Sequence, residues 1–381
     1  MGYRLPMIKI LHIAKYHDGR FGGIEHISYL INKNFSKKYD ITTLGFGKKK
    51  IKKIYKRNKI ILCKPMITIK SQPLSFQYVK EIITLSKKND LIYLHYPNVL
   101  AFFTLLFIKK HNIIIHWHSD IIKQKIIYLL IKWMEKRILK KSASIIVTSS
   151  NYLLASNPLK KFHQKISIIN FGMKDPYKNK IFKIKRLPTI ENIETKKINI
   201  LSVGRLVGYK GYKYLINSMI YLDKDKYQLT IIGDGKLKNK LTKICKINNL
   251  ENNVQILSNV DDRKKGVLFK NSHIFCLPSV SRAEAFGLVL LEALSYGMPL
   301  ITFYMPESGT NFINQDGVNG LLVNERNSKE LAKKIEEITY SKKTYEKLSK
   351  NARIDYEKRF KEDVFIDKMD KLFSRLSKTL S

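Results

Sequence analysis

Short apolar runs alternate with longer amphipathic segments through the first half of the chain. Runs without polar alternation, as expected for strands buried on both faces, lie at residues 8–13, 41–46, 91–95, 113–118 and 143–149. Helices are predicted around residues 27–35, 99–108 and 121–141. Because strands and helices alternate, the sequence predicts an α/β fold with a parallel sheet.

A second series of strands and helices begins at residue 198. Just before it, residues 174–197 lose apolar periodicity and are rich in Lys, Asn and Pro, which favours an interdomain linker. Since 381 residues suit two domains better than one, we expect an N-terminal domain at 1–185 and a C-terminal domain at 186–359. Further strands are predicted at residues 229–232, 254–260, 274–277 and 300–301, and a helical tail at 328–380.

The segment at residues 274–300 predicts a strand, a loop and a helix that carry two carboxylates. The helix is expected to begin near Glu284 to Gly287 and to end at Gly297. Glu284 and Glu292 are eight residues apart, which corresponds to about two helical turns.

The start of this helix is a candidate anion site. Backbone N–H groups in a first turn lack intrahelical acceptors and lie at the positive end of the helix dipole, here at Ala285, Phe286, Gly287 and Leu288. A carboxylate beside such amides suits a ligand with both hydroxyls and phosphates, such as a nucleotide sugar. The alternative interpretation is that both glutamates are solvent-facing helix residues.

A glycine-rich loop with two cations follows the predicted strand at residues 198–203. The loop reads G-R-L-V-G-Y-K-G and places Arg205, a bidentate phosphate ligand, near Lys210, a point charge. Two such cations beside one loop could bind a diphosphate without a metal ion. We therefore expect neither a metal ion nor a cofactor. Taken alone, this is equally well a basic surface loop.

Two loops of the N-terminal half carry weaker signals. Gly22 and Gly23 lie between the first strand and the first helix, where a double glycine lets the backbone approach a phosphate, although most such pairs are ordinary turns. His118 ends a predicted strand and Asp120 follows it, at the sheet edge where α/β proteins bind ligands. A lone histidine is more often structural than catalytic.

The chain is strongly basic, with 71 Lys and Arg against 31 Asp and Glu and a net charge of +40. Such a charge is typical of proteins that bind nucleic acid or anionic membranes, but Lys, Ile and Asn also share A/T-rich codons. Residues 48–59 hold eight basic residues in twelve, which favours a solvated surface loop or an anionic-lipid contact. The basic helix at 121–141, with Trp133 and Met134 on its apolar face, either packs on the sheet or seats at a membrane interface.

Cysteine usage and apolar run lengths suggest a compartment. Cys63, Cys245 and Cys276 are far apart and lack metal or redox spacing, as is typical of reduced thiols in the cytosol. No secretory signal is recognised, and the longest apolar run, 99–108, is about half of what a membrane span needs. We expect a cytoplasmic protein that is peripheral at the inner face of the cell membrane.

Several motifs, in order, resemble those of the retaining glycosyltransferase family 4. Glu284 and Glu292 stand in E-A-F-G-L-V-L-L-E-A, which resembles the E-x7-E signature of that family, and the loop at 204–211 resembles its phosphate motif. Residues 22–25 (G-G-I-E) resemble the G-G-x-E loop, and residues 233–235 the G-x-G turn beside the nucleotide. The resemblance covers essentially the whole chain, with the C-terminal motifs the more specific.

The resemblance implies the GT-B fold, in which two Rossmann-like doubly wound domains face each other across a cleft. It also implies a last helix, 360–381, that crosses back onto the N-terminal domain, with Tyr356 and Phe360 placed to make that crossing.

Roles for individual residues follow from the same resemblance. Glu284 would hold hydroxyls of the transferred sugar, Glu292 the ribose hydroxyls, and His118 would face the donor sugar, while Arg205 and Lys210 would bind the diphosphate. Further donor contacts would come from Gly22, Gly23, Gly233, Val260 and the amides of Phe286, Gly287 and Leu288. The family usually has glycine where Ser258 or Asn259 stands, so the contact to the base departs from the pattern.

These features predict a metal-independent, retaining glycosyltransferase. It would move a hexose-type sugar from a nucleoside-diphosphate sugar to a polyprenyl-diphosphate-linked glycan in bacterial O-antigen, capsule or lipopolysaccharide assembly. One alternative is a GT-B transferase that acts on a free small sugar or sugar phosphate. Another is a basic nucleic-acid-binding protein, although no RNP, helix-turn-helix or zinc spacing supports it. The sequence leaves the base, sugar, acceptor, linkage and oligomeric state open.

Overall fold

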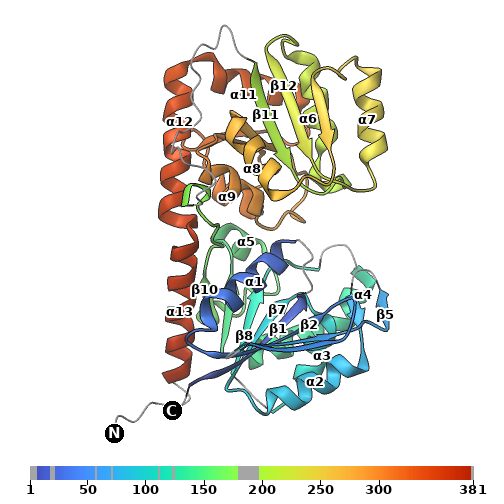
Figure 1. Cartoon of the computed structure of the whole chain (residues 1–381), viewed down its shortest axis with the longest axis vertical. Coiled ribbons are helices and arrows are strands. Elements are labelled where there is room, and N and C mark those ends of the chain that lie inside the picture. The colour runs from blue at the N-terminus through green and yellow to red at the C-terminus, as the bar shows by residue number, and fades with distance from the viewer. Residues whose placement is uncertain are drawn as a thin grey trace. The chain divides into compact units, whose positions relative to one another are not determined.

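The computed structural model of the chain describes residues 7–17, 22–55, 58–69, 72–109, 112–121, 125–178 and 197–378. The chain forms two compact units (Figure 1). The first comprises Met1–Thr148, Ser156–Asn170 and Phe365–Ser381, and the second comprises Ser149–Ala155 and Phe171–Val364. The expected domain boundary at residues 185–186 lies outside the described residues and stays a prediction.

The first unit is built on an eight-stranded sheet with the strand order β10-β9-β8-β7-β1-β2-β4-β3. Neighbouring strands are parallel except β3 and β4, which pair in the antiparallel sense. The strands are β1 (Lys9–Tyr16), β2 (Asp40–Phe46), β3 (Ile51–Tyr55), β4 (Asn58–Cys63), β7 (Leu91–Tyr96), β8 (Ile113–Trp117), β9 (Ser144–Val147) and β10 (Ile166–Ile168). A separate hairpin is formed by β5 (Ile67–Ile69) and β6 (Gln72–Leu74).

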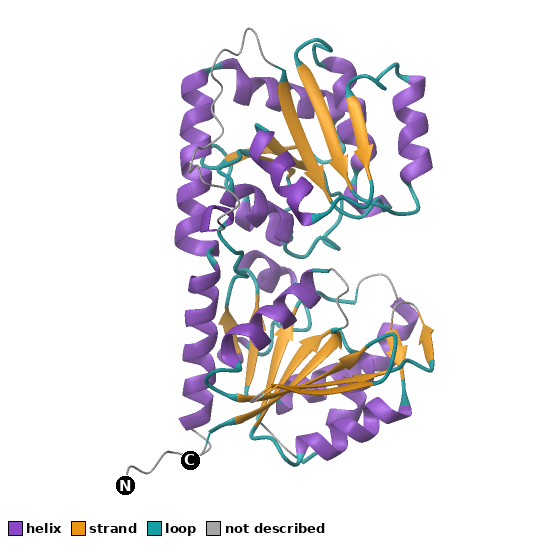
Figure 2. Cartoon of the chain, in the orientation of Figure 1, coloured by secondary structure: helices purple, strands orange, loops and turns teal. Residues whose placement is uncertain are grey.

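Helices lie against both faces of this sheet (Figure 2). They include α1 (Gly23–Phe35), α2 (Phe76–Ser86), α3 (Val99–Leu106) and α4 (Lys125–Lys141). The central strands β7 and β8 are buried at every residue, which accounts for their unbroken apolar pattern. The predicted strands form β1, β2, β7, β8 and β9 and pair in parallel as expected, whereas β3, β4 and β10 were not predicted.

The described part of the basic run at residues 48–59 is mostly strand, contrary to the expected surface loop, and residues 56–57 lie outside the described residues. Part of it forms β3, the edge strand of the sheet, and its end begins β4. Lys52 and Lys53 on β3 are exposed, and charged side chains of this kind keep an edge strand from pairing with another chain. The strand escaped prediction because too few apolar residues lie between its lysines.

Helix α4 packs part of its apolar face and leaves part in solvent. It begins at Lys125, and residues 122–124 of the predicted helix lie outside the described part. Met134, Ile138 and Leu139 are buried. Trp133, expected on the packed face, is 49% exposed, and the guanidinium carbon of Arg137 lies 5.3 Å from the centroid of its ring.

The second unit is built on a six-stranded, all-parallel sheet with the order β13-β12-β11-β14-β15-β16. The chain runs outward from β11 to β13 and then returns to place β14 on the other side of β11. Ligands of doubly wound sheets bind at such a reversal, outside the carboxyl ends of the strands. The strands are β11 (Ile198–Val203), β12 (Tyr227–Ile232), β13 (Val254–Leu257), β14 (Ile274–Leu277), β15 (Leu300–Phe303) and β16 (Gly320–Val323).

Helices α6 (Tyr212–Ser218), α7 (Lys238–Ile247), α11 (Ser328–Tyr340) and α12 (Lys342–Asp355) share one continuous core with this sheet, to which Leu215, Leu241, Leu331 and Tyr345 contribute. The second unit also contains α5 (Ser150–Ala155), α8 (Asp262–Asn271), α9 (Leu288–Ser295) and α10 (Gly309–Ile313).

The C-terminal segment joins the first unit through residues other than those expected. Tyr356 and Phe360 lie in a π-helical turn within the second unit, where the Tyr356 hydroxyl donates to the carbonyl of Met173 at 2.8 Å. In the final helix, α13 (Glu362–Lys378), Phe373 packs edge-on against aromatic rings of the first unit, at Phe35, Tyr39 and Tyr93. Apolar periodicity alone does not show which sheet a helical face will meet.

Candidate functional site

Two loops meet at the carboxyl ends of β11 and β14, where the strand order of the second sheet reverses. Residues 204–211 follow β11 and residues 278–287 follow β14. Gly211 has a φ of +66°, and a Cβ atom at this position would collide with the carbonyl oxygen of Pro278. Glycine at position 211 therefore allows both the left-handed turn and the contact between the two loops.

The contact between these loops brings Lys210 to Glu284. Lys210 Nζ lies 2.5 Å from Oε2 of Glu284, and the Ser279 hydroxyl donates to the same oxygen at 3.2 Å. The two charged side chains are only 8% and 11% exposed. Burial, with the charge of Glu284 as a smaller cause, raises the pKa of the neighbouring Tyr212 phenol. The loops thus hold a buried, mutually neutralising ion pair, because either charge alone would be costly to desolvate.

Arg205 lies on the same loop as Lys210 but faces solvent. It is exposed, and its Nη2 donates to the hydroxyl of Tyr209 at 3.3 Å. The two cations expected to bind diphosphate are therefore in different environments, with Lys210 paired to a carboxylate and Arg205 at the surface.

Helix α9 begins at Leu288, just after the range from Glu284 to Gly287 in which its start was expected. Gly287 is its N-cap residue, with a left-handed φ of +89°. Glu284, Ala285 and Phe286 consequently lie in the preceding loop, so the amides of Ala285 and Phe286 do not belong to the first helical turn as expected. A hydrogen bond from another segment holds this loop instead, because the amide of Gly309 donates to the carbonyl of Ala285 at 3.0 Å.

Phe286 directs its ring into the core. The side chain is buried and packs edge-on against Phe171 and Phe360, with ring centroids at 5.1 and 6.3 Å. The donor contact expected of Phe286 can therefore come from its backbone and not from its ring.

Glu292 is paired with a lysine that the sequence analysis did not single out. The carboxylate lies on α9, and Lys265 Nζ on α8 approaches its Oε1 to 2.8 Å. The two side chains are 19% and 27% exposed, so the pair is partly screened by solvent. Each glutamate of the E-x7-E motif therefore has its own lysine partner.

Gly233 and Val260 follow the strands β12 and β13 at the same edge of the sheet. A Cβ atom on Gly233 would collide with the carbonyl oxygen of Gly204. Glycine at position 233 therefore allows the turn after β12 to approach the loop at residues 204–211. The Ser258 hydroxyl donates to the carbonyl of Gly233 at 3.1 Å, which joins the ends of β12 and β13. Val260 is half-buried just beyond β13.

The first unit holds the remaining candidates. Gly22 is the N-cap of α1 and Gly23 its first residue, and both are exposed. His118 follows β8 and is 7% exposed, with Nε2 2.6 Å from Nδ1 of His95. Asp120 is engaged locally, since its Oδ1 accepts from Trp117 Nε1 at 2.9 Å and from the Ser156 hydroxyl at 2.7 Å.

Comparison with known proteins identifies the family. Residues 183–355 match the family model described as glycosyl transferases group 1. An uncharacterised 41.2 kDa protein in the cps region of Klebsiella pneumoniae is 31% identical over 299 residues, which are 72% of this chain and 75% of that protein. The chain belongs to the group 1 glycosyltransferases.

Other relatives of this glycosyltransferase match over nearly its whole length. The O-antigen chain mannosyltransferase C of Escherichia coli is 27% identical over 384 residues, 98% of this chain and 100% of that one. The crystal structure of Anabaena Alr3699/HepE in complex with UDP and glucose aligns with a TM-score of 0.74 at 18% identity, over 96% of this chain and 99% of that one. The predicted GT-B fold with two Rossmann-like domains is confirmed.

Two residues beside the glutamates of this glycosyltransferase were missed from the sequence. Ser279 bonds to Glu284, and its place two residues after β14 could have marked it, because ligands gather at such strand ends. Lys265 gave no signal, since it is one of three consecutive basic residues at 263–265. Its contact to Glu292 depends on how α8 packs beside α9.

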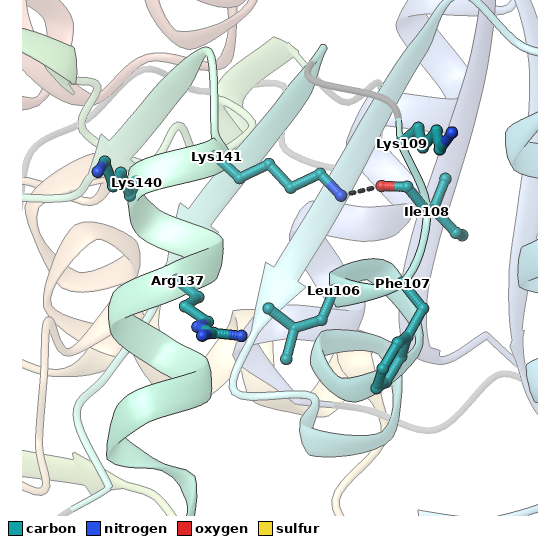
Figure 3. A pocket seen from close by; sticks show the side chains of 7 residues that line it. All are labelled: Leu106, Phe107, Ile108, Lys109, Arg137, Lys140 and Lys141. Carbon is teal, nitrogen blue, oxygen red and sulfur yellow. Dashed lines mark hydrogen bonds between the residues drawn. The ribbon is translucent and has the colours of Figure 1, made fainter.

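A basic pocket lies between the end of α3 and the last turn of α4 in the first unit (Figure 3). It measures about 640 Å³, and its lining is Leu106, Phe107, Ile108, Lys109, Arg137, Lys140 and Lys141. Lys141 Nζ donates to the carbonyls of Leu105 and Ile108, and burial lowers its pKa. Phe107 beside the pocket is 72% exposed. Among the described helices, none combines the length and the apolar character needed to cross a membrane.

Proposed function

We propose that this glycosyltransferase is a retaining member of family 4 that transfers a hexose-type sugar from a nucleoside-diphosphate sugar to a glycan acceptor. The observation that carries the proposal is the Lys210–Glu284 pair, with Arg205 on the same loop, at the strand-order reversal of the second sheet. Such a donor needs a carboxylate for its hydroxyls and cations for its diphosphate. The site supplies both within two adjoining loops.

In this proposal, the cations act on the leaving group. Negative charge grows on the β-phosphate as the glycosidic bond breaks, and Arg205 and Lys210 stabilise that charge more in the transition state than in the ground state. The amides of Gly287 and Leu288 at the start of α9 add to the positive field. This scheme assigns the charge of the diphosphate to Arg205, Lys210 and the amides at the start of α9, and it invokes no metal ion or other cofactor.

The remaining candidates divide between the sugar and the nucleotide. Glu284 and the Phe286 amide are assigned to the transferred sugar, and Glu292, held by Lys265, to the ribose. Gly233 and Val260 are assigned to the nucleotide, at the ends of β12 and β13. From the first unit, His118, Gly22 and Gly23 are assigned to the donor sugar and its phosphates.

The relatives suggest which pathway and which donors to test. The similarity to an O-antigen chain mannosyltransferase spans the whole chain, which supports a hexosyltransferase that builds bacterial O-antigen or a related surface polysaccharide. The UDP and glucose in the HepE structure support nucleotide-sugar chemistry on this fold.

Thermal unfolding with UDP, GDP and their hexose conjugates tests the donor class. A ligand at a hundred times its dissociation constant adds about 2.7 kcal/mol to the free energy of unfolding, so one nucleotide series should raise Tm clearly. We expect the rise to be lost in Arg205→Ala and kept in Lys243→Ala, which changes an exposed lysine on α7. The anomeric configuration of the product, read by NMR, tests retention. A chain that responds to no nucleotide sugar would contradict the proposal.

We further propose that the acceptor is linked to polyprenyl diphosphate and that the enzyme is peripheral at the cytoplasmic face of the membrane. The net charge of +40 supports attraction to anionic lipid. The basic pocket at α3 and α4 supports a more local contact. The half-exposed rings of Phe103 and Trp133 contact its lining residues Phe107 and Arg137, and aromatic rings beside cations suit a headgroup region.

A further inference from the structure

A row of buried histidines crosses the first sheet and ends at His118. His12 on β1, His95 on β7 and His116 on β8 occupy neighbouring parallel strands, and His95 stands opposite His116 in the register of β7 and β8. His12, His95 and His116 are at most 1% exposed. A buried imidazole costs free energy unless it is hydrogen-bonded, so the partners of these rings decide what the row can do.

Hydrogen bonds join three of these rings to the side chain of Asn32. Asn32 Oδ1 lies 3.0 Å from Nδ1 of His12 and accepts from the Thr43 hydroxyl at 2.7 Å. His12 Nε2 lies 2.8 Å from Nε2 of His95. His95 Nδ1 in turn lies 2.6 Å from Nε2 of His118. On its other side, Asn32 Nδ2 lies 3.0 Å from Nε2 of His17.

The direction of every bond in this chain follows from Asn32. An amide oxygen only accepts, so His12 must carry its proton on Nδ1. In a neutral ring Nε2 of His12 is then an acceptor, which requires His95 to donate from Nε2. His95 Nδ1 is consequently an acceptor, and His118 must donate from Nε2.

The rings in this chain are neutral. An additional proton on His12 or His95 would place two N–H groups against each other at one of the short contacts. On His118 the additional proton would lie on Nδ1, outside these contacts, and there burial opposes it. Burial also lowers the pKa of His12 to about 3 and the pKa values of His95 and His118 well below 6.5, with neighbouring imidazoles as a smaller cause for His95 and His118.

We propose that Asn32, acting through His12 and His95, fixes the tautomer of His118 with the proton on Nε2 and the lone pair on Nδ1. Asn32, His12 and His95 are thus positioning residues, and His118 is the residue they serve. The part of the proposal that concerns substrate rests on the proposed role of His118 beside the donor sugar.

The fixed tautomer restricts what His118 can meet. A group that lies against Nδ1 has to donate a hydrogen bond, as a sugar hydroxyl does. A carboxylate, which only accepts, could bind there only by protonating His118 on Nδ1, against the burial that lowers the pKa of that ring. The proposal therefore favours donors that present a hydroxyl at this position over uronic acids that present a carboxylate.

The same cluster could be taken for a metal site, because ligand atoms of His95, His116 and His118 all lie within 4.8 Å of one another. The ring planes argue against it, since they are stacked at only 11–22° to one another, with centroids 4.4–5.7 Å apart. Parallel rings direct their lone pairs along parallel lines and not toward one shared ion.

The test is a two-bond 1H–15N correlation spectrum of the full-length chain labelled with 15N-histidine, which distinguishes protonated from unprotonated ring nitrogens. We expect His12 protonated on Nδ1, and His95 and His118 on Nε2, assigned by single His→Gln variants. His118 protonated on Nδ1, or an imidazolium at neutral pH, would overturn the proposal. So would stoichiometric zinc in the purified protein. If one variant does not fold, assignment of either of the other two rings still decides, because the hydrogen bonds link the three tautomers to one another.

Two matched variants test the positioning role. His95→Phe breaks the series of hydrogen bonds from Asn32 to His118. His116→Phe removes a ring from the same stack, but Nδ1 of His116 contacts the Tyr93 hydroxyl and not a ring of that series. We expect His95→Phe to release the tautomer of His118 and to lower kcat/KM about tenfold, the value of one hydrogen bond, without changing nucleotide affinity. His116→Phe should leave the tautomer of His118 and kcat/KM unchanged. Equal losses in the two variants would overturn the proposal.

The experiment also separates this proposal from the proposed function. His118→Gln should lower transfer if His118 contacts the donor. Normal transfer by His118→Gln, with the expected tautomers in the wild-type spectrum, would refute the site role of His118 and leave the tautomer assignment standing.

Discussion

At the residue scale, the Lys210–Glu284 pair links stability to activity. Because these side chains are 8% and 11% exposed, removing one leaves the other as a buried charge without its partner. We expect Lys210→Met and Glu284→Gln each to lower the free energy of unfolding by about 3–5 kcal/mol. In urea denaturation, the double variant should be more stable than the sum of the two losses predicts, since no charge is left unpaired.

The matched control for this pair is Glu307→Gln. Its carboxylate lies 3.7 Å from Arg282, but its side chain is 63% exposed, so the change should cost little. We also expect Glu284→Gln to lower kcat/KM by about a hundredfold, because an interaction strengthened in the transition state is lost. Strictly additive losses in stability would mean that the two side chains do not act as a pair.

Lys265 is expected to act on donor binding and not on the chemical step. Its Nζ lies 2.8 Å from Oε1 of Glu292 and would orient that carboxylate toward the ribose. Lys265→Ala should raise the KM for the donor about fivefold and leave kcat nearly unchanged, as loss of uniform binding does. Steady-state kinetics with the donor varied can check this. Lys264→Ala, an exposed neighbour on α8, is the control, and an equal rise in that variant would show only a loss of surface charge.

At the scale of elements, two glycines separate backbone strain from close approach. Gly211 and Gly317 have nearly the same φ, +66° and +68°, but only at Gly211 would a Cβ atom meet another loop. We expect Gly317→Ala to cost about 1 kcal/mol, from φ alone, and Gly211→Ala to cost about 2–3 kcal/mol more and to reduce transfer. Chemical denaturation measures both. Similar costs would show that the approach of the two loops is unimportant.

The histidine row predicts a sheet that is sensitive to acid. Burial lowers the pKa values of His12, His95, His116 and His118, so these rings take up protons on unfolding once the pH falls below about 6.5. The unfolded state then binds more protons, and each histidine lowers the free energy of unfolding by about 1.4 kcal/mol per pH unit. Urea titrations from pH 6.5 downward should show a shallower fall in His116→Phe by about one such increment. Identical slopes would contradict the prediction.

Prediction of elements from the sequence succeeded where burial leaves a clear pattern. Strands β7 and β8 are buried throughout and read as unbroken apolar runs. Strand β3 does not read as an apolar run, because it carries the lysines that protect an exposed sheet edge. The start of α9 was placed too early because residues 284–286 have helical composition, while the left-handed Gly287 and the bond from Gly309 hold them in a loop.

At the scale of the whole molecule, the sequence gives the number and type of domains but not their membership. Alternation of strands and helices predicts two doubly wound sheets. It does not predict that Ser149–Ala155 joins the second unit, although these residues lie between strands of the first. Motif spacing singled out Glu284, Lys210 and Arg205, which lie in two adjoining loops, whereas Lys265 and the bonds among the histidines depend on contacts between elements distant in sequence. Such contacts leave no periodic signal.

The charge of the whole molecule predicts how it meets a membrane. A net charge of +40 alone would hold any face of the protein near anionic lipid, and salt would weaken that attraction. The basic pocket at α3 and α4 predicts a local contact in addition. We expect the full chain to sediment with vesicles of phosphatidylcholine and phosphatidylglycerol at low salt, but not with phosphatidylcholine alone.

Charge reversal at two places distinguishes a local contact from general attraction. Arg137→Glu/Lys140→Glu changes the pocket, and Lys243→Glu/Lys246→Glu makes the same change in net charge on exposed residues of α7. Since each basic residue near an anionic surface contributes about 1 kcal/mol, the first pair should weaken vesicle binding at least tenfold and the second only slightly. Phe107→Ser should weaken it further, because its ring is 72% exposed beside the pocket. Equal effects of the two charge reversals would mean that vesicle binding depends only on the net charge of the protein. In that case no particular face would be directed toward a lipid-linked acceptor.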